Sequence, residues 1–301
     1  MTETMSGTIQ SMTGYGNADG VLGTHRLSVE VRSVNHRFFT PSIKLPSALT
    51  RHEADVRELL RRHVTRGHVS LSLRIERDLT EGPRIDVARL IAYAEQLRAI
   101  PSDAGIDTRV DVASLLRLPD VITTSLNEDE SVGSLEPAEI LALITTAVEA
   151  FVRMRQAEGA RLAEYLLGRL EIIEEALGRL AARAPQRLVE QRDRLTMAVQ
   201  ELAAGVAVDP QRLAQEIAIL ADRVDVAEEL SRFASHNEAC RLALGSPGTE
   251  AVGKRLGFIL QEMVREANTT GSKANDAAMQ RDVVLIKEEL ERMREQVENL
   301  E

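Results

Sequence analysis

Apolar and polar residues alternate one by one in two segments of the first third of the chain, residues 27–34 and 69–75. This period of two is typical of a strand with one buried face. Between these segments, the apolar residues of 49–64 recur at helical spacing, and Gly67, directly after Arg66, is suited to cap that helix. Together the three segments predict a small sheet covered by a helix.

Weaker patterns complete the first half of the chain. Residues 12–16 predict the start of a further strand, whose two glycines allow either a bulge or the close approach of another backbone. Residues 87–99 predict a short helix, and residues 112–116 predict a further turn, within a transition over 79–135. The acidic run in 126–134 predicts an exposed loop.

From Glu136 onward the apolar residues recur at helical spacing. Pro137 is suited to the first turn of a helix, which is expected to end at Pro185 because proline lacks the N–H group that a helix interior needs. Asp209 and Pro210 form a strong start signal, Asp as the cap and Pro at the first helical position. The helices predicted after Pro185 cover residues 186–203, 209–244, 249–269 and 275–300.

The predicted fold is therefore α+β, with a small N-terminal sheet and covering helix followed by a long helical C-terminal region. We place the domain boundary between residues 10–135 and 136–301. Aromatic residues make up only 3% of the chain, with no tryptophan, which favours long helices packed through aliphatic side chains. Alternating charge along the last predicted helix is typical of intrahelical ion pairs or of a seam between subunits.

Charge is distributed unevenly along the 301 residues. The formal net charge is −10, which argues against coating of nucleic acid by bulk electrostatics. Residues 1–90 nevertheless carry 13 Lys and Arg against 10 Asp and Glu, and they hold five of the six histidines. The N-terminal part could face an anion while the C-terminal part supplies carboxylates, although a solvated acidic surface explains the second half equally well.

Several classes of protein are excluded or made less attractive by what the sequence lacks. Cys240 is the only cysteine, so no intrachain disulfide can form, as expected in a reducing cytoplasm. No apolar run approaches membrane-spanning length, and residues 1–10 lack the features of a signal peptide. Phosphate-loop, GxGxxG, GxSxG and CxxC motifs are missing. A soluble, cytoplasmic protein without a membrane partner is expected.

Carboxylates recur on two of the predicted helices. When residues 209–244 are projected as one helix, Asp225, Glu229, Arg232 and His236 fall within about 60° of one another. Such a stripe could bind a divalent metal or place an acid and a base near a phosphate. It is also what a solvated face looks like when Arg232 neutralises its acidic neighbours, and spacing alone favours that interpretation.

The next helix repeats this combination of groups. Glu262 and Glu266 stand four residues apart and so share a face. The helix is expected to loosen around Gly271, where backbone amides together with Lys273 could hold a phosphate. An ordinary helix-ending turn is the more common explanation of such a segment.

The end of the first alternating strand is rich in groups that bind nucleic acids. Arg32, Asn35, Arg37 and Phe38 offer guanidinium, amide and aromatic groups within seven residues, and Arg66 belongs to a second basic cluster at the helix–strand junction. Phosphate contacts and base stacking use this chemistry. Two such clusters in one small domain are stronger support for an anion-binding role than one would be.

With these residues in place, the chain resembles the YicC/YloC family from about residue 10 to its last residue. The resemblance is carried in order by residues 11–16, 29–37, 65–67, 223–230, 261–263, 265–269, 271–273 and 293–299. It implies a metal-dependent endoribonuclease that acts on single-stranded RNA, including small regulatory RNAs, with Mn or Mg as the cofactor. It further implies a homo-oligomer, a ring-like hexamer that closes on RNA.

Site residues follow from the resemblance by position. The implied catalytic residues are His236, Glu229, Glu262 and Glu266. The implied metal ligands are Asp225, Glu229, Glu262 and Glu266. The implied RNA contacts are Arg32, Asn35, Arg37, Arg66 and Lys273. The chain departs from the family pattern at Gly257, where Asp is usual, and at Val264, where Asn is usual, so activity is altered if either polar group helps to bind metal.

Two alternatives stay open at this point. In a metal-free route, the 2′-hydroxyl of RNA attacks the phosphate with His236 as the general acid or base. In the other, the chain is a non-catalytic oligomeric RNA-binding or RNase adapter protein, whose helices mainly build the assembly.

Overall fold

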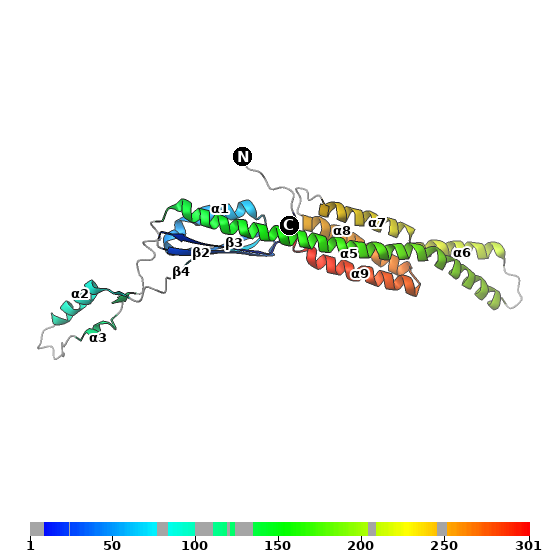
Figure 1. Cartoon of the computed structure of the whole chain (residues 1–301). Coiled ribbons are helices and arrows are strands. Elements are labelled where there is room, and N and C mark those ends of the chain that lie inside the picture. Colours follow the sequence, from blue (N-terminus) through cyan, green and yellow to red (C-terminus); the bar gives the residue numbers. More distant parts are fainter. Residues whose placement is uncertain are drawn as a thin grey trace. The chain divides into compact units, whose positions relative to one another are not determined.

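The structure is a computed structural model that describes residues 9–23, 25–76, 84–99, 111–118, 121–123, 135–203, 209–245 and 252–301. The chain forms two compact units. The sheet unit is Tyr15–Val152, and the helical unit combines Met1–Gly14 with Arg153–Glu301. The predicted α+β fold, with a sheet first and a long helical region after it, is confirmed (Figure 1).

A four-stranded sheet forms the centre of the sheet unit. Its strands are β1 (Gly14–Leu22), β2 (His25–Val34), β3 (Phe39–Lys44) and β4 (Gly67–Glu76). They lie in the order β1-β2-β4-β3, with β2 antiparallel and β3 parallel to β4. The crossover from β3 to β4 contains the 3-10 helix η1 (Ser47–His52) and helix α1 (Glu53–His63).

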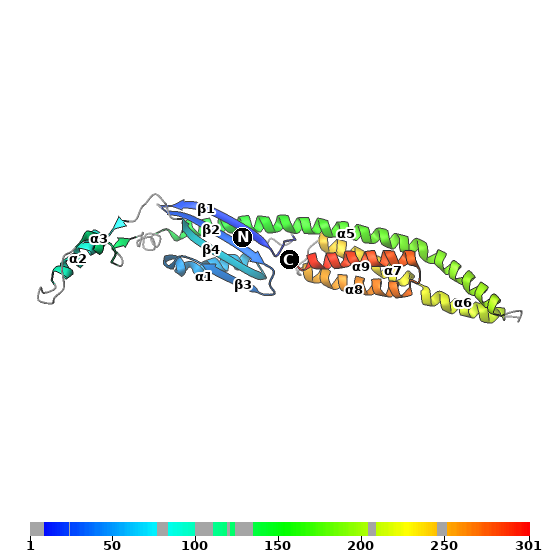
Figure 2. The ribbon, with the colours of Figure 1, turned by 90° about the horizontal axis from the view of Figure 1, so that it is seen from below.

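One face of this sheet is packed and the other faces outward. Leu27, Val29 and Val31 of β2 are fully buried, whereas the residues between them are at least partly exposed, which confirms the predicted alternation. Buried residues of α1 and of the first part of helix α5 (Pro137–Leu202), such as Leu60 and Phe151, belong to the same core (Figure 2).

Gly16 on β1 makes one of these contacts possible. A Cβ atom added there would lie 2.4 Å from both the Ala147 oxygen and the Phe151 nitrogen of α5. No side chain fits in that space, so only glycine lets β1 approach the helix backbone. Of the two alternatives predicted around residues 12–16, this confirms the close approach.

A smaller substructure follows in the sheet unit. It contains β5 (Arg84–Ile85), α2 (Val87–Arg98), α3 (Val112–Leu115) and β6 (Ile122–Thr123), with β5 antiparallel to β6. Asp86 and Asp111 cap the two helices by accepting hydrogen bonds from Arg89 N and Ala113 N. The predicted short helix is confirmed as α2, and the predicted turn at 112–116 is the short helix α3. The predicted acidic loop 126–134 lies outside the described residues.

The helical unit packs the remainder of α5 with later helices. These are α6 (Pro210–Val224), α7 (Ala227–Gly245), α8 (Val252–Lys273) and α9 (Ala277–Val297). Its core joins apolar side chains of four helices, among them Leu170 of α5, Phe233 of α7, Met263 of α8 and Ile286 of α9. Among the described residues, no helix is both long enough and apolar enough to cross a membrane.

Residues near the two ends of the chain join within the helical unit. Gln10 and Glu301 exchange two backbone hydrogen bonds, at 3.1 and 2.8 Å. The buried Arg155 side chain donates to the Ser11 carbonyl at 2.6 Å and pairs with the Glu301 carboxylate. The extended segment beginning at residue 9 is thereby attached to α5 and to the residues after α9.

Pro185 does not end a helix, so the predicted separation of 186–203 from the preceding helix is wrong. Helix α5 continues through Pro185 to Leu202. Arg187, buried two residues later, donates to the Lys273 carbonyl at 3.1 Å and to the Val224 carbonyl at 2.9 Å. These bonds tie α5 to the C-terminal ends of α6 and α8, and such tertiary contacts can outweigh the backbone hydrogen bond that proline forfeits.

The predicted single helix over 209–244 is also wrong, because it breaks at Asp225. This residue has extended backbone angles, φ −66° and ψ 129°, and its carboxylate accepts a hydrogen bond from Ala227 N at 2.9 Å. An aspartate that caps a new helix offers the backbone an alternative to continuing the old one. Residues 227–245 therefore form a separate helix with its own buried face.

Gly67 has a different role from the predicted helix cap. Helix α1 ends at His63, and Val64 is its C-cap with extended backbone angles. Gly67 instead begins β4 with φ +119°, a conformation that side chains disfavour. Its N–H group donates to the Phe38 carbonyl at 3.2 Å, so the glycine joins the β2–β3 turn to β4.

Candidate functional site

The buried face of α7 differs from the face that the sequence suggests. Glu229, Phe233, Asn237 and Cys240 are buried in the core at spacings of three and four residues. The sequence projection places Glu229 on a polar stripe with His236, apart from the apolar side. Because the helix starts anew after Asp225, Glu229 instead shares the inward face with Phe233.

Glu229 is held by a lysine from the neighbouring helix. The Lys273 ammonium donates to Glu229 Oε1 at 2.7 Å, while Glu229 Oε2 is buried and has no hydrogen-bond partner in the part of the chain described. The Glu229 side chain is 8% exposed and that of Lys273 is 29% exposed. A charge-assisted bond of this kind offsets the cost of burying the carboxylate, and one carboxylate oxygen is left available for another ligand.

A second ion pair joins the same two helices, but here the carboxylate is on α8 and the cation is on α7. The Glu266 carboxylate of α8 is buried, and the Arg232 guanidinium of α7 lies 3.7 Å from it. Arg232 also pairs with Glu228 one turn earlier on its own helix. Each helix thus supplies one carboxylate and one cation, and we call Glu229, Arg232, Glu266 and Lys273 the α7–α8 charge cluster.

Three other predicted site residues have separate surroundings. Asp225 uses its carboxylate to cap α7, and Glu262 pairs with Arg265 on its own helix at 3.8 Å. His236 is half-buried, and no hydrogen bond joins it to Glu229 or Glu266 among the residues described. The roles predicted for these three side chains stay predictions.

The α7–α8 charge cluster contains two of the four predicted metal ligands, Glu229 and Glu266. Within the described ranges, no three or more His, Cys, Asp or Glu side chains are arranged to hold a metal ion. Two buried carboxylates are nevertheless a suitable set for Mg²⁺, which usually binds one or two carboxylates and completes its coordination with water and substrate phosphate. The buried Glu229 Oε2, which has no hydrogen-bond partner among the described residues, is a further acceptor beside them.

The predicted loosening of the helix at Gly271 does not occur. Helix α8 continues to Lys273, and the Ser272 hydroxyl donates to the Thr269 carbonyl at 2.8 Å. A Cβ atom on Gly271 would lie 3.1 Å from a methyl group of Val283 on α9, so the glycine allows close packing of the two helices. The expected phosphate-binding turn is therefore wrong, although Lys273 itself reaches the α7–α8 charge cluster.

Three buried polar residues of the helical unit were not predicted from the sequence. Asn237 and Thr270 have side-chain polar atoms that are buried without a hydrogen-bond partner among the described residues. Arg187 donates hydrogen bonds to the last residues of α6 and α8. The inward face of α7 can be identified from the spacing of Glu229, Phe233 and Asn237 only after the helix is known to start at Ala227. Arg187 was not predicted because the sequence analysis ended its helix at Pro185.

In the sheet unit, two basic loops meet at one edge of the sheet. Strand pairing places Val34 opposite His68 and Phe39 opposite Gly67. The β2–β3 turn, residues 35–38, therefore adjoins residues 64–66 before β4, and we call these segments the loop pair. Three of the predicted RNA contacts lie in the loop pair: Asn35, Arg37 and Arg66.

Cations at this edge contact aromatic rings. The Arg37 guanidinium lies 5.2 Å from the centre of the Phe38 ring. Arg32, the fourth predicted contact from this unit, lies 5.2 Å from the ring of Tyr15 and 3.1 Å from the Glu30 carboxylate. Burial lowers the pKa of His63, so this imidazole is neutral near pH 7 and the arginines supply the positive charge.

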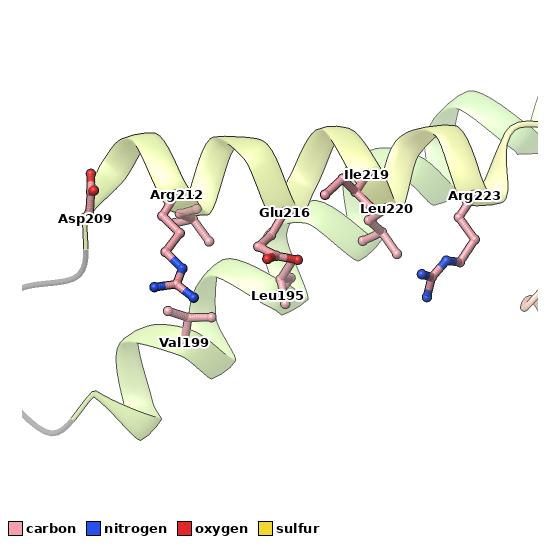
Figure 3. A pocket seen from close by; sticks show the side chains of 9 residues that line it. Leu195, Val199, Asp209, Arg212, Glu216, Ile219, Leu220 and Arg223 are labelled. Carbon is pink, nitrogen blue, oxygen red and sulfur yellow. The ribbon is translucent and has the colours of Figure 1, made fainter.

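An apolar groove lies elsewhere in the helical unit, between the last turns of α5 and helix α6 (Figure 3). Its volume is about 420 Å³, and α6 has no fully buried residue. Asp209 and Arg223 stand at its two ends, whereas the Arg212 and Glu216 side chains extend from α6 toward the end of α5. Its lining residues are Leu195, Val199, Asp209, Arg212, Leu213, Glu216, Ile219, Leu220 and Arg223, none of which is a predicted site residue.

Comparison with known proteins covers nearly the whole chain. Residues 9–164 match the family description "Endoribonuclease YicC-like, N-terminal region", and residues 180–301 match "Endoribonuclease YicC-like, C-terminal". A "Probable endoribonuclease YicC" of Haemophilus influenzae is 32% identical over 295 residues, 97% of this chain and 100% of that protein. A protein of the same description from Clostridioides difficile is 29% identical over 294 residues, 97% and 99% of the two chains.

Proposed function

The chain belongs to the YicC-like endoribonuclease family, and on that premise we propose that it is an endoribonuclease that cleaves single-stranded RNA in the cytoplasm. The predicted resemblance to this family is confirmed. Relatives described as probable endoribonucleases support an endoribonuclease role. Small regulatory RNAs as substrates and a homohexamer as the assembly are proposed on the resemblance alone.

The α7–α8 charge cluster is the observation that carries the proposed chemistry. Lys273 is partly exposed and bound to a buried carboxylate, so an arriving RNA phosphate can compete with Glu229 for the ammonium. As the ammonium turns toward the phosphate, the Glu229 carboxylate becomes free to hold a cation or to accept a proton from a water molecule. Arg232, half-exposed beside Glu266, can stabilise the negative charge that develops on the phosphate oxygens.

A divalent cation is the cofactor we propose for this site, with Glu229 and Glu266 holding it. When bound, Mn²⁺ or Mg²⁺ would polarise the scissile phosphate and lower the pKa of an attacking water. Asp225 and Glu262 are the further ligands that the resemblance implies, and His236 is the implied acid. RNA binding is assigned to Arg32, Asn35, Arg37 and Arg66 of the sheet unit, with Lys273 as the contact in the helical unit.

One observation favours a second candidate, a non-catalytic oligomeric RNA-binding or RNase adapter protein. Both carboxylates of the α7–α8 charge cluster already have a cation as partner. Reciprocal pairs of this kind can simply fix the register of two packed helices. In that case RNA binds to the loop pair and is not cleaved.

A cleavage assay with a metal titration separates these possibilities. Purified protein is incubated with end-labelled single-stranded RNA in Mn²⁺ or Mg²⁺, and then with EDTA, and the product ends are mapped. The proposal expects metal-dependent cleavage that leaves no 2′,3′-cyclic phosphate. Cyclic phosphate ends with EDTA present would identify the 2′-hydroxyl route, for which His236 is the candidate acid or base. Binding without cleavage under any metal would identify the adapter.

Glu266→Gln and Glu262→Gln form a matched pair of variants for the same assay. Glu266 is buried in the α7–α8 charge cluster, whereas Glu262 lies one turn away on the same helix and pairs only with Arg265 in the described structure. Loss of cleavage with retained RNA binding in Glu266→Gln supports its role in the chemistry. Loss in Glu262→Gln as well supports the larger ligand set that the resemblance implies.

A further inference from the structure

Phe38 presents an apolar ring to water at the edge of the sheet. Its side chain is 62% exposed, in the turn between β2 and β3. A single exposed apolar residue is common in soluble proteins and by itself indicates nothing. Three further observations at this turn give the ring a function.

First, the backbone that carries the ring is fixed. The Phe38 carbonyl accepts a hydrogen bond from Gly67 N at 3.2 Å, and the Phe38 N–H group donates to His36 Nδ1 at 3.3 Å. Gly67 can reach this position because it adopts φ +119°. The turn is therefore fixed by one hydrogen bond from β4 and by another within the turn itself, while the ring stays outside the core. A rigid aromatic group loses little conformational entropy when a flat ligand stacks on it.

Second, the surroundings of the ring are basic to a degree that the whole chain is not. The loop pair and the residues next to it, 31–39 and 59–69, contain five arginines and no Asp or Glu, although the net charge of the chain is −10. The Arg37 guanidinium lies 5.2 Å from the ring centre, and among the described residues no carboxylate pairs with it. Such an arrangement suits a polyanion.

Third, the combination of an aromatic ring and a guanidinium recurs in this unit. Arg32 lies 5.2 Å from the ring centre of Tyr15, and Arg61 lies 5.7 Å from that of Phe39. Proteins that bind single-stranded nucleic acids combine these two groups, because the ring stacks on a base and the cation binds the adjacent phosphate. Within a duplex both faces of a base are already stacked, so an inserted base must be unpaired.

We infer that Phe38 is a stacking platform for an unpaired RNA base, with Arg37 bound to an adjacent phosphate. This rests on the proposed function, in which RNA is the ligand, and it adds the means by which single strands are chosen over duplexes. An acidic peptide would use the arginines but has no flat base to place on the ring, so it serves as a competing ligand in the test.

The chain contains no tryptophan, which allows a direct measurement of stacking. Phe38→Trp introduces one fluorophore at the platform, and fluorescence is followed in EDTA, so that metal-dependent cleavage does not interfere. The probes are an unpaired oligoribonucleotide and an abasic oligomer of the same length and charge. Phe258→Trp is the matched control, because Phe258 is 67% exposed but lies on α8 in the helical unit.

We expect the unpaired oligoribonucleotide to quench the fluorescence of Phe38→Trp, and the abasic oligomer to leave it nearly unchanged. Phe258→Trp should respond to neither, which excludes bulk absorption as the cause. Equal quenching by the abasic oligomer, or by a poly-glutamate peptide, would overturn the stacking inference, because phosphate or carboxylate contact alone then explains the signal.

Binding affinities supply a second, independent measurement. Phe38→Ala should bind the unpaired oligoribonucleotide between about fivefold and about 150-fold more weakly than the native protein, and Phe38→Tyr should bind it nearly as well. Phe258→Ala and binding to a duplex of the same sequence should be unaffected. Unchanged affinity in Phe38→Ala overturns this inference but leaves the proposed function intact if the native protein cleaves RNA. If the native protein neither binds nor cleaves RNA, both fall.

Discussion

The Lys273 ammonium lies 2.7 Å from the Glu229 carboxylate, and this bond joins the last residue of α8 to the first turn of α7. The two residues are 44 positions apart in the sequence. One carboxylate oxygen is occupied by the lysine and the other is buried without a partner among the residues described. The pair therefore combines a structural bond with an unused acceptor, and the two roles can be measured separately.

Glu229→Gln should reduce the rate of RNA cleavage by about 100-fold or more, the effect expected when an acid–base group is removed. It should also lower the free energy of unfolding by about 1 to 3 kcal/mol, because Lys273 loses its counter-charge. Single-turnover cleavage and urea unfolding measure the two effects. Glu228→Gln is the control, since that exposed neighbour pairs only with Arg232 in the described structure and should change stability by less than about 1 kcal/mol. Cleavage at the native rate by Glu229→Gln would remove it from the chemistry.

Cys240 should not react with thiol reagents in the native protein. Burial raises the pKa of its thiol to about 12, so very little thiolate exists at pH 8, and the side chain contacts Met263 inside the core. We expect labelling by iodoacetamide to be slow in buffer and fast in denaturant. Cys240→Ala should cleave RNA at a rate within about twofold of the native protein and lose about 1 to 2 kcal/mol of stability. Fast native labelling would contradict the packing described here.

Two glycine substitutions should change stability in opposite directions. Gly16→Ala places a methyl group 2.4 Å from backbone atoms of α5 and should destabilise the sheet unit by about 2 kcal/mol or more. Gly178→Ala lies within α5, where an added Cβ meets nothing within 4 Å, and should stabilise by about 0.5 to 1 kcal/mol. Thermal unfolding of both variants is the measurement. A stable Gly16→Ala protein would show that β1 and α5 separate more easily than the contact distances indicate.

Stability should decline in acid as Asp276 takes up a proton. Its hydrogen bond with Arg183, and those from the Met279 and Ala278 N–H groups, hold the pKa of Asp276 at about 2, below its usual 3.8. Since the folded state lowers this pKa, its contribution is complete above about pH 4 and is lost as the pH falls through 2.

Asp276→Asn tests this pH dependence. The difference in unfolding free energy between it and the native protein should be about 1 to 2 kcal/mol at pH 7 and should disappear toward pH 2. Asp193→Asn, which removes an exposed carboxylate paired with the adjacent Arg192, should give only a small difference at any pH. A difference for Asp276→Asn that stays constant with pH would indicate that shape, not charge, sets its contribution.

Much of the fold could be predicted because local pattern decides it. The alternation around Val29 and Val31 specifies which face of β2 is buried, and Asp209 with Pro210 marks the start of α6. Helix ends were harder to predict. Asp225 can continue a helix or cap the next, and the choice depends on the carbonyl of Val224, which the buried Arg187 binds from α5. A contact between residues so far apart in sequence is not visible in local spacing.

The candidate site was predictable in its residue types but not in its pairing. The spacing rule places Glu262 and Glu266 on one face, yet only Glu266 is buried in the α7–α8 charge cluster. Which residues of α7 and α8 meet depends on where α7 begins, and its start at Ala227 was not predicted. The ion pair between Glu229 and Lys273 was likewise not predictable, because Lys273 reaches Glu229 only when α8 extends through Gly271.

The hydrogen bonds between Gln10 and Glu301 have a consequence for biosynthesis. Residue 10 leaves the ribosome long before residue 301, so the backbone pairing that closes the helical unit has to wait for about 290 intervening residues to be made. The sheet unit, Tyr15–Val152, is completed long before that and can fold while translation continues. Arg155, which binds Ser11 and Glu301, should therefore obtain its full set of partners only after Glu301 has been made. Any tag fused directly after Glu301 would be placed where that last step occurs.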